Sequence, residues 1–249
     1  QKTAYEIPKR DWSSDVCSSD LSASLGAQTA ATRIRVELVD TTTVRLPGEA
    51  DSNSPAIWDM VRGRDVLFVM TSINGQVSAA AGRGYTSLGA ARPVVFVDPT
   101  PPGGVWMEAV IRDVDGTWYG YYHNETVATM CRGSEKMIPR IGAAVSRDRG
   151  ATWNPLGTIL EAPPRTYDCG TDNYYFVGGV GDFSVQLDAA SRYLYFFYSE
   201  YLRDPASQGV AVARLAWADR DAPAGQIDVW HDGTWLPARQ IGSAVAPRY

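Results

Sequence analysis

The order of apolar and polar positions from Arg33 onward is that of β-strands joined by turns. Apolar and β-branched residues alternate with polar ones over short runs, and the runs end in clusters of Gly, Pro, Asp, Asn and Ser, as strands and turns do. No stretch has the length and 3.6-residue period of an ordinary amphipathic helix, and only residues 218–222 suggest a short helical turn. The chain is therefore expected to be all-β.

The clearest single unit is a β-hairpin predicted over residues 105–125. Residues 105–112 and 117–123 have the composition of strands, and Asp115-Gly116 stands in the turn between them. Asp-Gly favours a tight hairpin because both residues accept the positive φ angles that the turn needs. The first strand carries an acid, Glu108, among apolar neighbours. A carboxylate on a buried strand is costly unless it is paired or has a function.

Similar runs predict three successive sheets. The expected strands are 56–58, 65–72, 76–81 and 92–97 in the first sheet; 105–112, 117–123, 140–146 and 153–160 in the second; and 178–188, 192–201, 209–216 and 227–230 in the third. Two more strands are expected earlier, at 33–39 and 41–46. Sheets repeated at a long period are typical of a β-propeller. Because propellers have about four to eight blades, we expect an incomplete fragment of about three blades.

One turn in the second sheet matches the Asp-box pattern S-x-D-x-G-x-T-W in full. The matching residues are Ser146, Asp148, Gly150, Thr152 and Trp153. In such a turn the Asp accepts backbone N–H groups, the Gly takes a left-handed conformation and the Trp packs beneath the hairpin. The pattern predicts a structural hairpin of a propeller blade, on a face away from any active site.

The first 31 residues are expected to lie outside the folded domain. Residues 1–21 resemble a translated sequencing adapter, with Cys17 between two near repeats; a disordered polar terminus is the alternative. Residues 22–31 are small and Ala-rich, like the end of a signal peptide or like a flexible linker. The predicted organisation is therefore a terminus over 1–31 and a partial propeller over 32–249. A signal peptide would make the protein secreted or periplasmic.

Two cysteines remain in the folded part, Cys131 and Cys169. Both stand in predicted loops, and neither belongs to a CxxC pair or a zinc-like cluster. In an exported chain they would form a disulfide, whereas two free thiols are the alternative.

Composition limits the classes of partner. The 249 residues carry a net charge of −5, and no basic stretch provides the face that nucleic acid would need. No apolar run approaches the ~20 residues of a membrane-spanning helix, so no membrane partner is expected. Cofactor motifs such as G-x-G-x-x-G after a strand or G-x-S-x-G are absent from the sequence. No cofactor or metal is expected, although a structural calcium stays open.

Three acids stand near the start of the three predicted blades: Asp51, Glu108 and Asp182. The first strand of each propeller blade begins near the axis, so acids at these positions converge on a central pocket. Converging carboxylates suit glycoside hydrolysis, in which one is protonated and another ionised. Each aspartate could instead be a plain turn residue. The candidate substrate-binding residues are Asn53, Trp106, Tyr122 and His123.

This three-acid layout resembles the five-bladed propeller glycoside hydrolases of the invertase-like and arabinanase-like groups. In that superfamily an Asp of the first blade is base or nucleophile, an acid of the second adjusts a pKa, and a Glu of the third is the general acid. The resemblance implies the first role for Asp51. Trp106-Met107-Glu108 is similar to the W-x-E around the invertase-like acid, but it falls on the second predicted blade. Asp182 then falls where a Glu is expected, so the roles of Glu108 and Asp182 stay open.

Residues 178–188, 192–201 and 208–225 are also similar to uncharacterised secreted bacterial propeller proteins with an Asp box. The predicted function is acid–base cleavage of a poly- or oligosaccharide, by a protein that is monomeric when full-length. One alternative is a non-catalytic propeller that binds carbohydrate or another protein. A second is a sialidase-like exo-glycosidase, which would need arginines for the substrate carboxylate. Arg83, Arg140 and Arg165 are the residues it could recruit.

Overall fold

A computed structural model describes residues 44–46, 48–203, 206 and 208–240. All of these belong to one compact unit. The predictions for residues 1–31, for Cys17 and for a strand at 33–39 lie outside the described residues. Of the strand predicted at 41–46, residues 44–46 are described, and they are not in a strand. The propeller domain predicted over 32–249 is thus described between residues 44 and 240, apart from the gaps named above.

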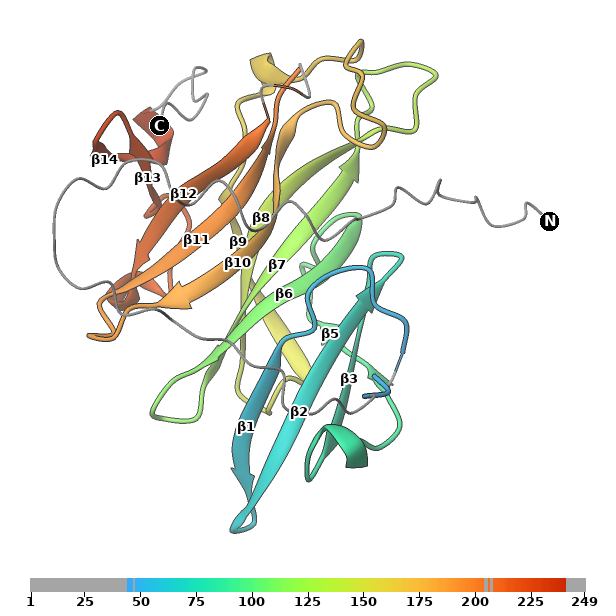
Figure 1. Ribbon diagram of the computed structural model, residues 1–249, viewed down its shortest axis with the longest axis vertical. Coiled ribbons are helices and arrows are strands. Elements are labelled where there is room, and N and C mark those ends of the chain that lie inside the picture. Colours follow the sequence, from blue (N-terminus) through green and yellow to red (C-terminus); the bar gives the residue numbers. More distant parts are fainter. Residues whose placement is uncertain (1–43, 47, 204–205, 207, 241–249) are drawn as a thin grey trace, which may run out of the picture. The chain divides into compact units, whose positions relative to one another are not determined.

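The described residues form three antiparallel meanders, which follow one another along the chain (Figure 1). The first sheet consists of β1 (Ala56–Val61), β2 (Arg64–Ile73), β3 (Gln76–Gly82) and β4 (Arg92–Pro93). The second consists of β6 (Gly104–Arg112), β7 (Trp118–Val127), β8 (Met137–Ser146) and β9 (Thr152–Leu160), with β5 (Val95–Phe96) at its edge. The third consists of β10 (Gly179–Leu187), β11 (Tyr193–Tyr201), β12 (Gly209–Ala216), β13 (Asp228–His231) and β14 (Thr234–Pro237).

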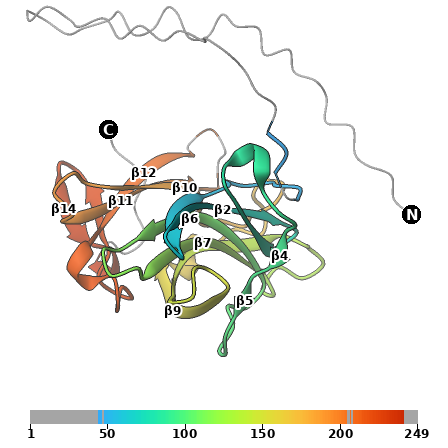
Figure 2. The ribbon, with the colours of Figure 1, turned by 90° about the horizontal axis from the view of Figure 1, so that it is seen from below.

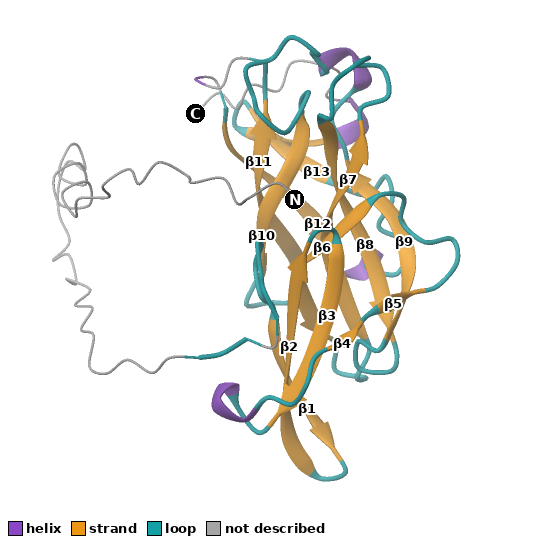
Figure 3. Cartoon of the chain, turned by 90° about the vertical axis from the view of Figure 1, so that its right-hand side faces the viewer, coloured by secondary structure: helices purple, strands orange, loops and turns teal. Residues whose placement is uncertain are grey.

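Helix is confined to short 3₁₀ turns within the described residues, and strands dominate Figure 3. The turns are η2 (Tyr85–Ser87), η3 (Pro164–Thr166), η5 (Trp217–Asp219) and η6 (Ala238–Gln240). The helical turn expected at 218–222 overlaps η5. Within the described part of the chain, no helix has the length and hydropathy of a membrane span.

The three sheets are three consecutive blades of a β-propeller. Each meander begins with its inner strand, and β1, β6 and β10 run in the same direction (Figure 1). The middle blade contacts both others, because β6 lies against β1, β2 and β3 and also against β10 (Figure 2). Three blades are fewer than the four to eight of typical propellers. The all-β class and the number of blades agree with the prediction.

Two apolar layers hold the blades together. Met70, Met107, Trp118 and Trp153 are almost fully buried between the first and second blades. Tyr121, Ile141, Phe196 and Leu215 are equally buried between the second and third. Strand alternation explains both layers, because each strand of the middle blade sends successive side chains to opposite faces of its sheet.

The segment predicted as one strand over 92–97 is divided between two blades, so that prediction was wrong. Val94 N–H still donates to Val77 of the first blade (2.9 Å), but Val95 N–H donates to Ala151 of the second (3.3 Å). β5 then pairs with β9 in parallel. A continuous strand-like composition does not reveal that the segment passes from one blade to the next. Residues in both parts of the segment pair their backbone N–H and C=O groups as strand residues do, but with different blades.

Ion pairs at one end of the blades tie each blade to the next. Asp59 of the first blade is buried and accepts from Arg112 (2.9 Å) and Arg149 (3.1 Å) of the second. Asp113 of the second blade pairs with Arg220, which follows the third-blade strand β12 (2.8 Å). These carboxylates are paired as buried charges require.

The Asp-box residues form a closed hydrogen-bonded turn between β8 and β9. Asp148 accepts from Thr152 N–H (2.9 Å), Thr152 Oγ1 (2.6 Å) and Ser146 Oγ (2.9 Å). Gly150 has a φ of 79°, and its carbonyl accepts from the fully buried Trp153 indole (3.1 Å). This turn lies where β6 and β8 end, opposite to the end where the inner strands begin.

Candidate active site

The three predicted acids line a single open hollow of about 490 Å³. Asp51 comes from the loop before β1, Glu108 from β6 and Asp182 from β10, so each blade contributes one carboxylate. The remaining lining residues are Ser52, Asn53, Phe183, Ser184, Phe197 and Val210. Inner strands that run in the same direction place equivalent positions of neighbouring blades side by side, which brings acids distant in sequence to one site.

Glu108 and Asp182 are each the extra residue of a β-bulge. In β6, Met107 pairs with Tyr122 and Ala109 with Tyr121, which leaves Glu108 without a partner. In β10 the register likewise passes from Gly181 to Phe183 and omits Asp182, whose φ is +40°. A bulge releases one side chain from strand alternation and can re-aim it, and bulges are frequent next to active sites.

The environment of Glu108 favours the protonated form of its carboxyl group and raises its pKa toward neutrality. Its side chain is buried, at 7% exposure, and burial raises its pKa to about 7. The Asn53 backbone N–H, which donates to Oε2 (3.2 Å), and His123 act in the opposite direction, whereas the charges of Asp182 and Asp51 add to the rise. A carboxyl with this pKa can deliver a proton at neutral pH.

Asp51 is exposed and is held at both its backbone and its side chain. Its N–H donates to the Ser72 carbonyl (3.1 Å), and its Oδ1 accepts from the Trp106 indole (2.8 Å). Ser72 Oγ also accepts from Met107 N–H (3.0 Å), one residue before Glu108. The loop that carries Asp51 is therefore fixed to the strand that carries Glu108.

The carboxylate of Asp182 is largely exposed, with a side-chain exposure of 65%. Its Oδ2 accepts from the Tyr201 hydroxyl, and its backbone N–H donates to His123 Nδ1 (3.0 Å). These two bonds fix the bulge while leaving much of the carboxylate open to a ligand.

His123 supports the site from beneath. It is 2% exposed; its Nδ1 accepts from Asp182 N–H (3.0 Å), and its Nε2 lies 3.0 Å from Glu125 Oε1. A Cβ at Gly181 would come within 2.4 Å of this ring, so only glycine fits there. The buried position does not support the predicted sugar contact by His123.

The other predicted binding residues take three different positions. Asn53 lines the hollow, and its side-chain amide donates to the Phe183 carbonyl (2.9 Å), which ties the first blade to the third. Trp106 holds Asp51, as described. Tyr122 does not reach the hollow: it is 3% exposed and packs on Phe96 and Gly142 between the first two blades. Its position does not support a role in sugar binding.

Sequence reasoning missed one wall of the hollow. The exposed side chains of Phe197 and Val210, from the third blade, give it an apolar part. It also missed Tyr201, the hydrogen-bond donor to Asp182. A signal did exist in β10, because apolar positions 180 and then 183, 185 and 187 break the two-residue period at Asp182, and such a break predicts a bulge.

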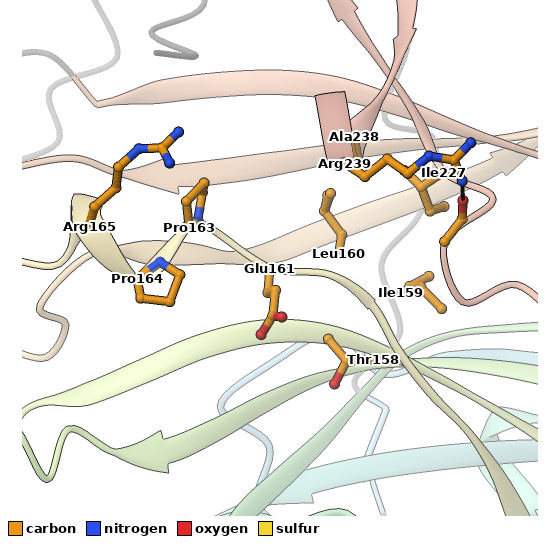
Figure 4. A pocket seen from close by; sticks show the side chains of 12 residues that line it. Thr158, Ile159, Leu160, Glu161, Pro163, Pro164, Arg165, Ile227, Ala238 and Arg239 are labelled. Atoms are coloured by element: carbon orange, nitrogen blue, oxygen red, sulfur yellow. Dashed lines mark hydrogen bonds between the residues drawn. The ribbon is translucent and has the colours of Figure 1, made fainter. Parts of the chain in front are cut away.

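A second hollow, of about 380 Å³, lies between the end of β9 and the segments that flank β13 and β14 (Figure 4). Arg165 and Arg239 lie at opposite ends of it, and Arg239 donates to the Gly225 carbonyl (3.2 Å). Among its described lining residues the one carboxylate is Glu161, which pairs with Arg140 (3.2 Å). The described lining therefore does not show the pair of carboxyl groups that acid–base hydrolysis uses.

The arginines that a sialidase would need lie elsewhere. Arg83 lines a separate hollow beside β3, Arg140 is paired with Glu161, and Arg165 lines the hollow of Figure 4. Over the described residues, no group of three or more His, Cys, Asp or Glu has the arrangement of a metal site.

The loop before β10 is joined to the loop after β7 by a disulfide between Cys131 and Cys169. Cys131 is buried with Ala128, Ile138 and Val177 in a small apolar cluster. Of the two alternatives left open by the sequence, the bonded pair is the one present.

Comparisons with known proteins give similar backbones and no family. No protein-family model and no curated protein matches the chain. Among solved structures it is similar to an endo-arabinase from Bacteroides thetaiotaomicron, with 16% identity, 73% of this chain and 61% of that chain covered, and a TM-score of 0.43. An exo-β-1,3-galactanase from Phanerochaete chrysosporium shares 13% identity over 80% of this chain and 42% of its own, with a TM-score of 0.44.

An inulosucrase from Halalkalicoccus jeotgali shares 18% identity over 72% of this chain and 55% of its own, with a TM-score of 0.42. The chain thus spans between 42% and 61% of the length of these three structures. Similarity at this level leaves activity and substrate undetermined.

Proposed function

We propose that this propeller is a glycoside hydrolase that cleaves a neutral poly- or oligosaccharide in the hollow between its three inner strands. The observation that carries the proposal is that one hollow holds a buried Glu108 with a raised pKa together with two accessible carboxylates, Asp51 and Asp182. Carboxyl groups whose environments separate their pKa values are what acid–base hydrolysis of a glycosidic bond uses.

In this mechanism Glu108 is the general acid. Its proton moves to the glycosidic oxygen as the bond between that oxygen and the anomeric carbon breaks. An ionised aspartate on the other side of the sugar either takes a proton from the attacking water or attacks the anomeric carbon itself. We assign this role to Asp51, because Trp106 orients its carboxylate and leaves one oxygen available. Asp182 then raises the pKa of Glu108 through its charge.

The electrostatics of the hollow favour an uncharged substrate. Among the described residues, three carboxyl groups and no Lys or Arg side chain line it, so an anionic sugar would meet repulsion from the ionised acids without a compensating cation nearby. The apolar part formed by Phe197 and Val210 offers a surface for the C–H face of a sugar ring. These features weigh against the sialidase alternative. The disulfide supports an oxidising compartment, which is consistent with the proposed export.

Release of reducing ends from arabinan, galactan, xylan and inulin tests the proposal. We expect hydrolysis of at least one of them by the wild-type protein, and a loss of roughly 10²–10⁴-fold in rate for Glu108→Gln, the usual contribution of general acid catalysis. Glu161→Gln is the matched control, since Glu161 is a carboxylate of the other hollow, and its rate should equal that of the wild type. Binding without hydrolysis of any polysaccharide would favour the non-catalytic alternative instead.

A further inference from the structure

Two adjacent tyrosines stand exposed on the loop that leads into β10. Tyr174 is 76% and Tyr175 65% exposed, and their rings pack edge to face with centroids 4.7 Å apart. The loop ends at the start of an inner strand, so it lies at the same end of the blades as the acidic hollow; it is the yellow to orange segment at the top of Figure 1. Single exposed apolar residues are ordinary, whereas paired aromatic rings beside a binding hollow suggest a ligand.

A continuous series of ring contacts connects these tyrosines with the hollow. Tyr175 contacts Phe176 (6.2 Å between centroids), and Phe176 contacts Tyr201 (4.5 Å). Tyr201 in turn donates its hydroxyl hydrogen to Asp182, which lines the hollow. Phe176 is buried, so the series passes from solvent at Tyr174 through the protein surface to one of the three acids.

The loop holds the two rings in a fixed position. Asn173 Oδ1 accepts from the backbone N–H groups of Tyr175 and Phe176, both at 2.9 Å. The Tyr175 carbonyl accepts from Met137 N–H (2.7 Å). The disulfide at Cys169 adds a covalent link to the neighbouring loop. A rigid aromatic side chain loses little conformational entropy when it binds, which makes such a position efficient for recognition.

We propose that Tyr174 and Tyr175 form an outlying carbohydrate-binding subsite, occupied by sugar units of the same neutral chain that enters the acidic hollow. This inference rests on the proposed function for the identity of the ligand. Each tyrosine offers an apolar face for the C–H side of a sugar ring and a hydroxyl for its oxygens. The subsite gives higher affinity for chains that are long enough to reach from the hollow to the loop than for short oligosaccharides and monosaccharides.

The test compares affinity for long and short chains, using a Tyr174→Ala/Tyr175→Ala double variant. Retardation in native gels that contain arabinan, galactan, xylan or inulin gives the affinity for polymers, and calorimetry with the corresponding disaccharide gives that for short chains. We expect the double variant to lose about tenfold in affinity for the polymer that retards the wild type, and nothing for the disaccharide. Tyr174→Phe/Tyr175→Phe, which keeps both rings, should recover most of the loss.

Trp230→Ala is the matched control, because Trp230 is an exposed aromatic residue (45%) on β13, near the outer edge of the third blade. Its polymer affinity should equal that of the wild type. Any of three results would overturn the inference. The double variant and the wild type could bind the polymer equally well, or the Trp230 variant could lose as much affinity as the double variant. The third result is that none of the four polymers retards the wild-type protein. A lost retardation in the double variant without hydrolysis by the wild type would leave the subsite standing and refute only the hydrolase proposal.

Discussion

Glu108 and Asp182 occupy equivalent irregularities in successive blades: each is the unpaired residue of a bulge in the inner strand. Glu108 is omitted from the register of β6 with β7, and Asp182 from that of β10 with β11. The side chains before and after each bulge remain in the apolar layers, as Met107 and Phe183 do. The bulges thus place acids at a shared hollow without interrupting the packing between the blades.

Loss of the buried carboxylate Asp59 should weaken the attachment of the first blade. Asp59→Ala leaves Arg112 and Arg149 without their shared partner. Because both arginines are partly exposed and can be rehydrated, we expect the free energy of unfolding to fall by about 1–3 kcal/mol rather than by the full value for a buried pair. Urea unfolding followed by tryptophan fluorescence measures the change. Arg192→Ala, which removes an exposed pair with Asp188, should alter it by less than about 0.5 kcal/mol, and an equal effect of both variants would contradict this account.

The Asp-box acid should contribute to stability and not to catalysis. Burial opposes the ionisation of Asp148, but the hydrogen bonds from Thr152 and Ser146 outweigh it and lower its pKa below the ordinary 3.8. Its stabilisation is therefore present above pH 3.8 and is lost as the pH falls through the lower folded-state value. Because Asp148 is exposed and solvent weakens its interactions, we expect Asp148→Ala to cost about 0.5–1.5 kcal/mol at pH 7 and less at pH 2, with the specific activity of folded protein unchanged. Thermal unfolding at both pH values checks this; an undiminished cost at pH 2 would show that the carboxylate charge is not involved.

The disulfide should stabilise the two loops beside the hollow. Cys131 and Cys169 are 38 residues apart in sequence, and closing a loop of this length in the unfolded chain contributes roughly 3–4 kcal/mol in the chain-entropy model. A Cys131→Ser/Cys169→Ser variant and the reduced wild type should therefore unfold at the same, lower urea concentration. Unfolding midpoints that match those of the oxidised wild type would show that the bond adds no stability.

Buried Glu200 on β11 should make stability depend on pH near neutrality. It is 7% exposed, its Oε2 has no hydrogen-bond partner within the described residues, and burial raises its pKa from 4.5 to about 7. The folded state then binds more protons than the unfolded state between these values, so stability is full below pH 4.5 and falls as the pH rises to about 7.

Glu200→Gln, which resembles the protonated acid, should remove this loss. We expect the variant to match the wild type at pH 4 and to be more stable at pH 8 by up to about 3 kcal/mol, from 1.36 kcal/mol per pKa unit. Glu108 has a raised pKa too, so part of the pH dependence should remain in the variant. Urea unfolding at the two pH values measures both contributions, and parallel curves for the variant and the wild type would exclude a titrating Glu200.

Local signals made most of the fold predictable from the sequence. The hairpin predicted over residues 105–125 is formed by β6 and β7 around the Asp115-Gly116 turn, in which Gly116 has a φ of 89°. The division of residues 92–97 between two blades could not be foreseen, because it depends on which neighbouring strand offers free carbonyls. Tyr122 has the same aromatic character as Tyr201, and only the register decides that Tyr201 reaches Asp182 while Tyr122 lies in the core.

The pH dependence of kcat/KM for the hydrolysed polysaccharide tests the central claim most directly. If Glu108 is the general acid, activity requires its proton, so kcat/KM should fall about tenfold per pH unit above a pKa of about 7. Glu108→Gln should retain polysaccharide binding at pH 6 while losing this alkaline limb together with the activity. A rate that stays level from pH 6 to pH 9, or hydrolysis by Glu108→Gln at the wild-type rate, would contradict the assignment of Glu108.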